Sequence, residues 1–202
     1  MSDAQTTTTV QKLGVKDGLK NIYYAKLTQD NSAGVSYDTL VKLGHARKAT
    51  ISKETETVTI YGDNAAVATK SRLKSVSVSI ETTDIPLKDQ AILLGHGYDS
   101  VTGMMTAKGD DSAPYVALFF EATKFTGGSA FYKFAKGKFA EGNEEFSTQE
   151  ENMSTTSPSM EGKFIAREYD NLIYTKADSA ESISTTITSA WYTATGGEPS
   201  SD

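Results

Sequence analysis

The spacing of apolar and polar residues predicts a chain made mainly of β-strands. The clearest alternation runs through residues 72–81, where Val76, Val78 and Ile80 alternate with Ser75, Ser77, Ser79 and Glu81. Successive side chains of a strand point to opposite faces, so the apolar set is expected in a core. The opposite face, with its small hydroxyls and one carboxylate, suits a smooth, hydrated surface rather than a catalytic one.

A second strand over residues 54–61 carries the same pattern, with Val58 and Ile60 alternating with Thr57 and Thr59. The two strands are predicted to pair as a long hairpin that puts the hydroxyls of both on one shared face without cations. Residues 62–70 between them form a longer connection than a tight hairpin needs. The sequence leaves open whether this connection is a free surface loop or docks on another subunit.

One short helix is predicted after the hairpin, over about residues 86–95. Asp84 can cap its start, Pro86 suits its first turn, and Gly95 and Gly97 can end it. Nothing in this segment points to catalysis.

Short, turn-separated strands are predicted along the rest of the chain. They cover residues 21–27, 38–43, a stretch through Ala49 and Ile51, 115–125, 130–139, 157–167 and 172–176, with a hairpin turn at residues 126–129. In that second hairpin the aromatic residues are expected in the core and Lys124, Lys133, Lys136 and Lys138 in water, an interpretation favoured over a base-stacking surface. Residues 183–192 fit either a strand or a short helix.

Length and composition indicate one domain with tails. The 202 residues suffice for one sizeable core, and 16 Gly, 10 Tyr and 8 Phe suit a turn-rich β fold. Residues 1–18 are polar and Thr-rich and are predicted to form a flexible N-terminal arm. Residues 19–176 are predicted to be the β domain, and residues 177–202 a Ser/Thr-rich C-terminal extension.

Charge and composition narrow the function classes. The formal net charge of -6 disfavours a nucleic-acid binder that neutralises phosphates. The absence of cysteine excludes disulfides, redox cysteines and thiolate metal ligands. No signal-peptide core and no stretch of roughly 20 apolar residues is found, so we expect a soluble protein without membrane insertion.

No catalytic, cofactor-binding or metal-binding residue is predicted, and the chain is expected not to be an enzyme. His45 and His96 belong to no catalytic or zinc motif; His96 is expected to bond the last carbonyls of the helix, and His45 to lie at the surface. An acidic cluster lacks the pattern of a calcium loop or a glycosidase pair, and is predicted to be a solvated loop or to meet a basic neighbouring chain. Its members are Glu141, Glu144, Glu145, Glu150 and Glu151.

Four segments in collinear order carry a family resemblance. They are GLKNIYYAKLTQD, VSVSIETTDIPLKDQAILLGHGYD, APYVALFF, and KGKFAEGNEEFSTQEEN followed by SPSMEGKFIAREYD, and they span about residues 18–170. In this succession the chain resembles the major tail proteins, or tail tube proteins, of long-tailed, non-contractile phages of Gram-positive bacteria. The first residues and the tail after Asp178 match no part of that pattern.

The resemblance implies a structural virion protein with a β-sandwich or barrel, one flanking helix and long hairpins. Six copies are expected to close into a ring, and the rings to stack into the hollow tail tube through which the genome is ejected into the host. The implied partners are tape measure, tail terminator and tail-tip proteins, with transient, non-specific passage of DNA and no cofactor. Assembly is expected in the host cytoplasm.

Two sets of residues receive roles through this resemblance. The polar face of the long hairpin is expected to line the lumen through Thr57, Thr59, Ser75, Ser77, Ser79 and Glu81. The connection is expected to link one ring to the next through Gly62, Asp63, Asn64, Ala65, Ala66, Val67, Ala68, Thr69 and Lys70. The alternatives are a tube subunit of a related injection or secretion machine, such as a phage-derived bacteriocin, and a β-sandwich carbohydrate-binding module. A single tryptophan, Trp191, argues against the module, which would need a row of exposed aromatic residues.

Overall fold

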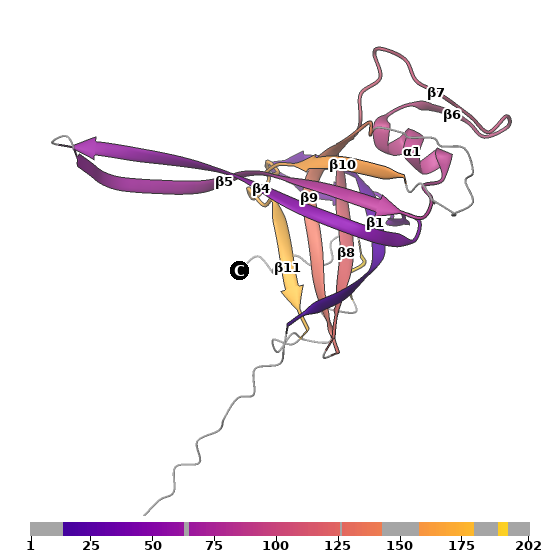
Figure 1. The fold of residues 1–202 in the computed structure, drawn as a ribbon. Coiled ribbons are helices and arrows are strands. Elements are labelled where there is room, and N and C mark those ends of the chain that lie inside the picture. Colours follow the sequence, from indigo (N-terminus) through magenta and orange to yellow (C-terminus); the bar gives the residue numbers. More distant parts are fainter. Residues whose placement is uncertain (1–13, 63–64, 126, 143–157, 180–189, 194–202) are drawn as a thin grey trace, which may run out of the picture.

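The computed structural model shows a large, twisted antiparallel sheet with one short helix at its side (Figure 1). The structure describes residues 14–62, 65–125, 127–142, 158–179 and 190–193. Within these ranges the elements are β1 (Lys16–Asn31), β2 (Gly34–Tyr37), β3 (Val41–Lys42), β4 (Ala46–Gly62), β5 (Ala65–Thr82), α1 (Leu87–Leu94), β6 (Gly97–Asp99), β7 (Met104–Thr106), β8 (Val116–Lys124), β9 (Ser129–Ala140), β10 (Ser159–Phe164) and β11 (Tyr174–Asp178). The prediction of a mainly β fold with a flanking helix is confirmed.

The strands of the large sheet follow the order β2-β1-β8-β9-β10-β5-β4. β11 pairs with β9 beside β10, and β3 pairs with β1. β6 and β7, which the sequence pattern did not predict, form a separate two-stranded sheet. β4 is therefore an edge strand, whereas β8 and β9 lie in the middle.

The central strands β8 and β9 are buried on both faces. One face contributes Leu118, Phe120 and Phe134 to the main core, which also takes Val76, Val78 and Ile80 from β5. The other face packs Phe119 and Phe131 against Trp191, which is 1% exposed. Because both sides are covered, the alternation in these strands does not separate buried from solvated residues.

The prediction that the four lysines of this hairpin lie in water is wrong. Lys133 is 0% exposed and its ammonium lies over the rings of Tyr37 and Phe119, at 5.3 Å from each ring centroid. Lys124 is also buried and forms an ion pair with Asp178. A central position in the sheet accounts for this burial, because lysine side chains there meet other chain segments on either face.

The helix α1 forms largely as predicted, apart from its cap. Pro86 occupies the N-cap position without a side-chain hydrogen bond, so the expected cap by Asp84 is wrong. Gly95 ends the helix in the left-handed region at φ 79°, as predicted. A Cβ at this position would lie 2.3 Å from the carbonyl oxygen of Ser112, so glycine also permits the close approach of the following loop.

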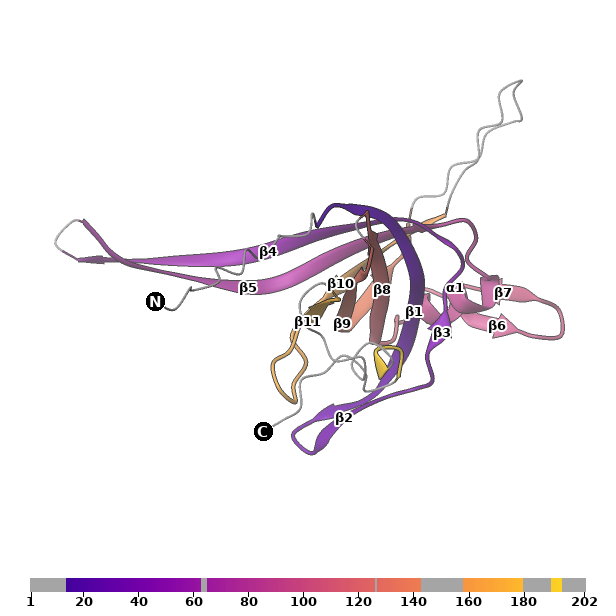
Figure 2. The same ribbon diagram turned by 90° about the horizontal axis from the view of Figure 1, so that it is seen from below.

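Two ribbons mark opposite ends of the molecule. In both Figure 1 and Figure 2 the β4–β5 hairpin projects from one side of the body, and α1 with the β6–β7 ribbon lies at the other side. The body between them holds the two cores. This arrangement gives the molecule two distinct protruding surfaces.

Candidate functional site

The β4–β5 hairpin extends well beyond the body of the sheet. β10 pairs with β5 only from Val76 to Glu81, whereas β4 follows β5 as far as the Gly62–Ala65 pair. We call residues 55–62 and 65–73 the projecting ribbon. At about 3.3 Å per residue, its eight-residue arm in β4 reaches roughly 25 Å.

This pairing corrects the predicted connection. Most of residues 62–70 are strand: Lys70 pairs with Val58, Thr69 with Thr59 and Ala68 with Ile60. Only Asp63 and Asn64, which lie outside the described residues, stand between the last paired positions. The partner stretch in β4, residues 58–61, consists of Val, Thr, Ile and Tyr, which favour extended backbone and explain why the strands continue.

A bulge divides the hairpin into two differently phased parts. Glu54 pairs with Ser75 and Thr55 with Leu73, so Lys74 is an extra residue on β5. Lys74 and Ser75 both bond the Glu54 carboxylate, at 3.1 and 2.7 Å. The extra residue keeps Leu73 packed against the main core while the polar neighbours stay on the opposite side.

The hairpin consequently has two faces, here named the charged face and the core-side face. The charged face holds Thr50, Ser52, Glu54, Glu56, Val58 and Ile60 of β4, opposite Ser79, Ser77, Ser75, Arg72, Lys70 and Ala68 of β5. The core-side face holds Ala49, Ile51, Lys53, Thr55, Thr57 and Thr59, opposite Ile80, Val78, Val76, Leu73, Ser71 and Thr69. Thr57 and Ser71 join their hydroxyls at 2.8 Å on this second face.

The prediction of one shared hydroxyl face is therefore wrong. Ser75, Ser77, Ser79 and Glu81 lie on the charged face, and Thr57 and Thr59 lie on the core-side face. The alternation in each strand was identified correctly, but the phase between the strands was not. A bulge shifts that phase by one residue and leaves no mark in either pattern.

The charged face is also not free of cations, contrary to the prediction. Its cations form ion pairs: Lys48 with Glu81 at 3.3 Å, Arg72 with Glu56 at 2.8 Å, and both Lys74 and Lys163 with Glu54 at 3.1 and 3.0 Å. The hydrogen bond from Ser75, followed by those from Lys163 and Lys74, lowers the pKa of Glu54 to about 2. This surface thus alternates in charge along its length.

His96 makes side-chain contacts that its sequence position did not indicate. Its backbone N–H caps the helix by donating to the carbonyl of Ala91, but its ring bonds carboxylates: Nδ1 with Asp111 and Nε2 with Glu141, each at 2.8 Å. The bond with Asp111 raises the pKa of His96 above its ordinary value, against the effect of burial and with support from Glu141. The ring therefore does not bond the helix carbonyls as expected. Its two bonds instead connect the end of α1 to the loop after β7 and to the residue that follows β9.

The acidic cluster is described only at its start. Glu141 is exposed and bonds His96 of the same chain. Glu144, Glu145, Glu150 and Glu151 lie outside the described residues. His45 is exposed, as predicted.

The described ranges contain no group of three or more histidine and carboxylate side chains arranged to hold a metal ion. Among their helices, none has the length and hydropathy needed to cross a membrane. The notable surfaces of this part of the chain are therefore its two ribbons.

A long edge hairpin is a template for pairing with another chain. Comparison with known families agrees: the family described as phage tail tube protein matches residues 6–189. The chain belongs to the phage tail tube protein family. Among curated proteins, no match is found.

Membership places this tail tube protein in the virion tail as a structural component that assembles with other tail proteins into a tube. It confirms the resemblance to phage tail tube proteins that was drawn from the four sequence segments. The burial of Trp191 further separates the tail tube protein from a module that displays aromatic residues to sugars.

Proposed function

We propose that six copies of the tail tube protein close into a ring, and that stacked rings form the conduit for genome ejection into the host. The projecting ribbon is the observation that carries this proposal. Within the described residues, its β4 arm pairs only with β5, and its β5 arm pairs only with β4. Both outer edges of the ribbon thus present free backbone hydrogen-bonding groups.

An isolated two-stranded ribbon is marginally stable in water, and an open strand edge favours uncontrolled pairing with other chains. Ring closure removes both problems, because the β5 edge of one copy can pair with the β4 edge of the next. The two edges differ, so the contact is heterologous and repeats around an axis. A wall of twelve strand arms from six ribbons would follow.

The part of the charged face next to the body, at Ser77, Ser79 and Glu81, is what we assign to the lumen. Val76, Val78 and Ile80 face the core, so Ser77, Ser79 and Glu81 point away from the body of the subunit. DNA moving past this face meets cations that are already bonded to carboxylates, which limits ion pairing with phosphates. By the same geometry, Thr57 and Thr59 are assigned to the opposite side of the wall.

The remaining roles follow from the proposed tube. The ribbon end around residues 62–70 reaches toward the adjacent ring. The acidic segment that begins at Glu141 meets a basic neighbouring chain. Tape measure, terminator and tail-tip proteins complete the tail, which assembles in the host cytoplasm.

The test is electron microscopy of the purified protein at rising concentration, with and without the ribbon. Residues 58–70 are replaced by an Asn-Gly turn, which suits a two-residue hairpin. We expect the shortened variant to keep the unfolding midpoint of the parent while forming neither rings nor tubes. A control with Thr57→Ser and Thr59→Ser keeps the backbone of the ribbon and should assemble. Normal tubes from the shortened variant would overturn the proposal.

A further inference from the structure

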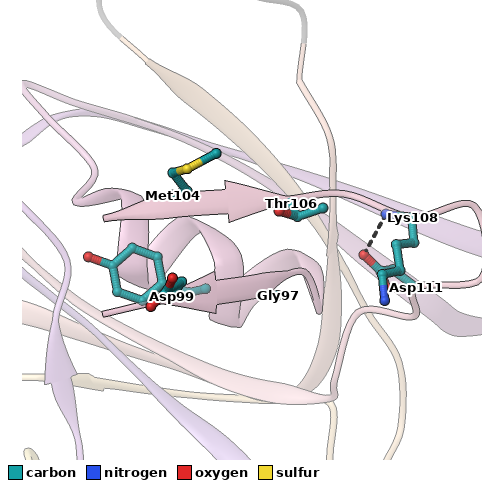
Figure 3. A pocket seen from close by; sticks show the side chains of 7 residues that line it. Gly97, Asp99, Met104, Thr106, Lys108 and Asp111 are labelled. Atoms are coloured by element: carbon teal, nitrogen blue, oxygen red, sulfur yellow. Dashed lines mark hydrogen bonds between the residues drawn. The ribbon is translucent and has the colours of Figure 1, made fainter. Parts of the chain in front are cut away.

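The β6–β7 ribbon carries an open hollow at the end of the molecule away from the projecting ribbon. The hollow has a volume of about 400 Å³ and is lined by Gly97, Tyr98, Asp99, Met104, Thr106, Lys108 and Asp111 (Figure 3). Asp99 pairs with Met104 and Gly97 with Thr106, so these four residues share one face of the ribbon. The face thus combines an apolar side chain with a carboxylate.

Large apolar side chains on this ribbon are exposed. Val101 is 92% exposed, Met104 62% and Tyr98 37%. β6 and β7 pair only with each other among the described strands. A short ribbon with exposed apolar residues gains stability when another surface covers it.

The ribbon is held in place by its own hydrogen bonds, so the hollow exists before any partner binds. Asp99 accepts bonds from the Val101 N–H and the Thr102 hydroxyl, at 2.8 and 2.7 Å. At the base, Asp111 accepts the Lys108 N–H at 2.9 Å, the bond drawn in Figure 3, and binds His96. A preformed site loses little conformational entropy on binding.

The projecting ribbon offers a matching surface at the other end. On its charged face, Val58 is 54% exposed and Ile60 60%, and these residues lie opposite Lys70 and Ala68. The patch therefore has three apolar side chains and one ammonium group. Around the hollow, Asp99, Asp111 and the neighbouring exposed Asp110 supply three carboxylates against the single ammonium group of Lys108.

We propose that the β6–β7 hollow receives the Val58–Ile60 patch from a second copy of this chain in the adjacent ring. Apolar side chains of the ribbon cover Met104 and Val101, and Lys70 lies near Asp99 and Asp110. The two surfaces lie at opposite ends of one molecule in both views, so the contact joins different molecules and propagates along an axis (Figures 1 and 2). This inference rests on the proposed tube and names the surface that accepts the ribbon.

The absence of cysteine from the chain allows a direct test. The double variant Ile60→Cys with Met104→Cys is assembled under reducing conditions, imaged, oxidised and separated without reductant. We expect a ladder of covalent oligomers that extends past six subunits, because each link joins one ring to the next. Each single-cysteine variant should give no ladder beyond a dimer.

The control double variant pairs Ile60→Cys with Phe125→Cys, a residue that is 78% exposed on the β8–β9 turn. It should not form the ladder. Three results would overturn this contact while leaving the tube proposal intact. They are tubes without cross-links in the Met104 variant, a ladder that stops at six subunits, and an equal ladder from the control. If the parent protein forms neither rings nor tubes, the tube proposal itself is overturned.

Discussion

The β8–β9 and β4–β5 hairpins are both long antiparallel strand pairs of one sheet, but their surroundings are opposite. In β8–β9, even Lys133 is fully buried, whereas in the projecting ribbon Val58 and Ile60 are more than half exposed. The difference arises from position in the sheet: β8 and β9 lie between other strands and between two cores, and β4 lies at the edge.

This contrast separates two uses of the same kind of element, an antiparallel hairpin. The central hairpin stabilises the subunit, and the edge hairpin leaves the same types of residue available to other copies. Alternation therefore predicts a strand, but the neighbours of that strand determine whether its apolar residues stabilise the fold or an assembly.

The largest expected effect comes from truncating one side chain in each hairpin. Phe134 is 1% exposed and packs against Phe120, Phe164 and Tyr174, so Phe134→Ala should lower the free energy of unfolding by about 3–5 kcal/mol. Val58→Ala should change it by about 0.5 kcal/mol or less in the unassembled protein. Urea denaturation measures both, and similar losses would remove the contrast between the hairpins.

A smaller loss is expected from adding one methyl group to the central sheet. A Cβ on Gly137 of β9 would lie 2.4 Å from Cδ1 of Phe164, so Gly137→Ala should cost about 1–3 kcal/mol through overpacking. Gly109→Ala is the matched control, because a Cβ there meets no atom within 4 Å. Comparing the unfolding midpoints of the two variants measures this loss of stability. An unchanged midpoint for Gly137→Ala would show that the core accommodates the added methyl group without cost.

The smallest expected effect concerns the ion pairs of the charged face. The pKa of Glu54 falls from 4.5 to about 2 on folding, so its stabilising effect is present above pH 4.5 and is lost as the pH falls toward 2. Glu54→Gln should therefore lower the urea midpoint near neutral pH and converge with the parent in acid. Glu161→Gln, a carboxylate removal from the neighbouring strand β10, controls for net charge. A difference that grows toward low pH would contradict the assigned role of Glu54.

Local patterns predicted the elements whose determinants are local. The alternation of Val76, Val78 and Ile80 identified β5 and its core face, and Gly95 marked the helix end. The bulge at Lys74 was not predictable in this way, because it depends on packing Leu73 into the core and on the partner strand. The partners of His96 lie 15 and 45 residues away in sequence, which no nearby motif indicates.

The long hairpin was therefore predicted correctly, but the phase between its two strands was predicted wrongly. The β6–β7 ribbon was missed because its strands span three residues each, too few for a period to show. Family membership, by contrast, was predicted from the order of four sequence segments along the chain, because several segments in the same order are more specific than any single short strand.

The bulge at Lys74 also affects which changes in chain length the hairpin can tolerate. Removing Lys74 would erase the kink while every remaining pair keeps its partner and its face. Removing one paired residue such as Arg72 would instead move the side chains beyond it to the opposite face. Insertions and deletions in this strand are thus unequal in effect, and a change in the length of β5 is tolerated best at a position without a pairing partner, such as Lys74.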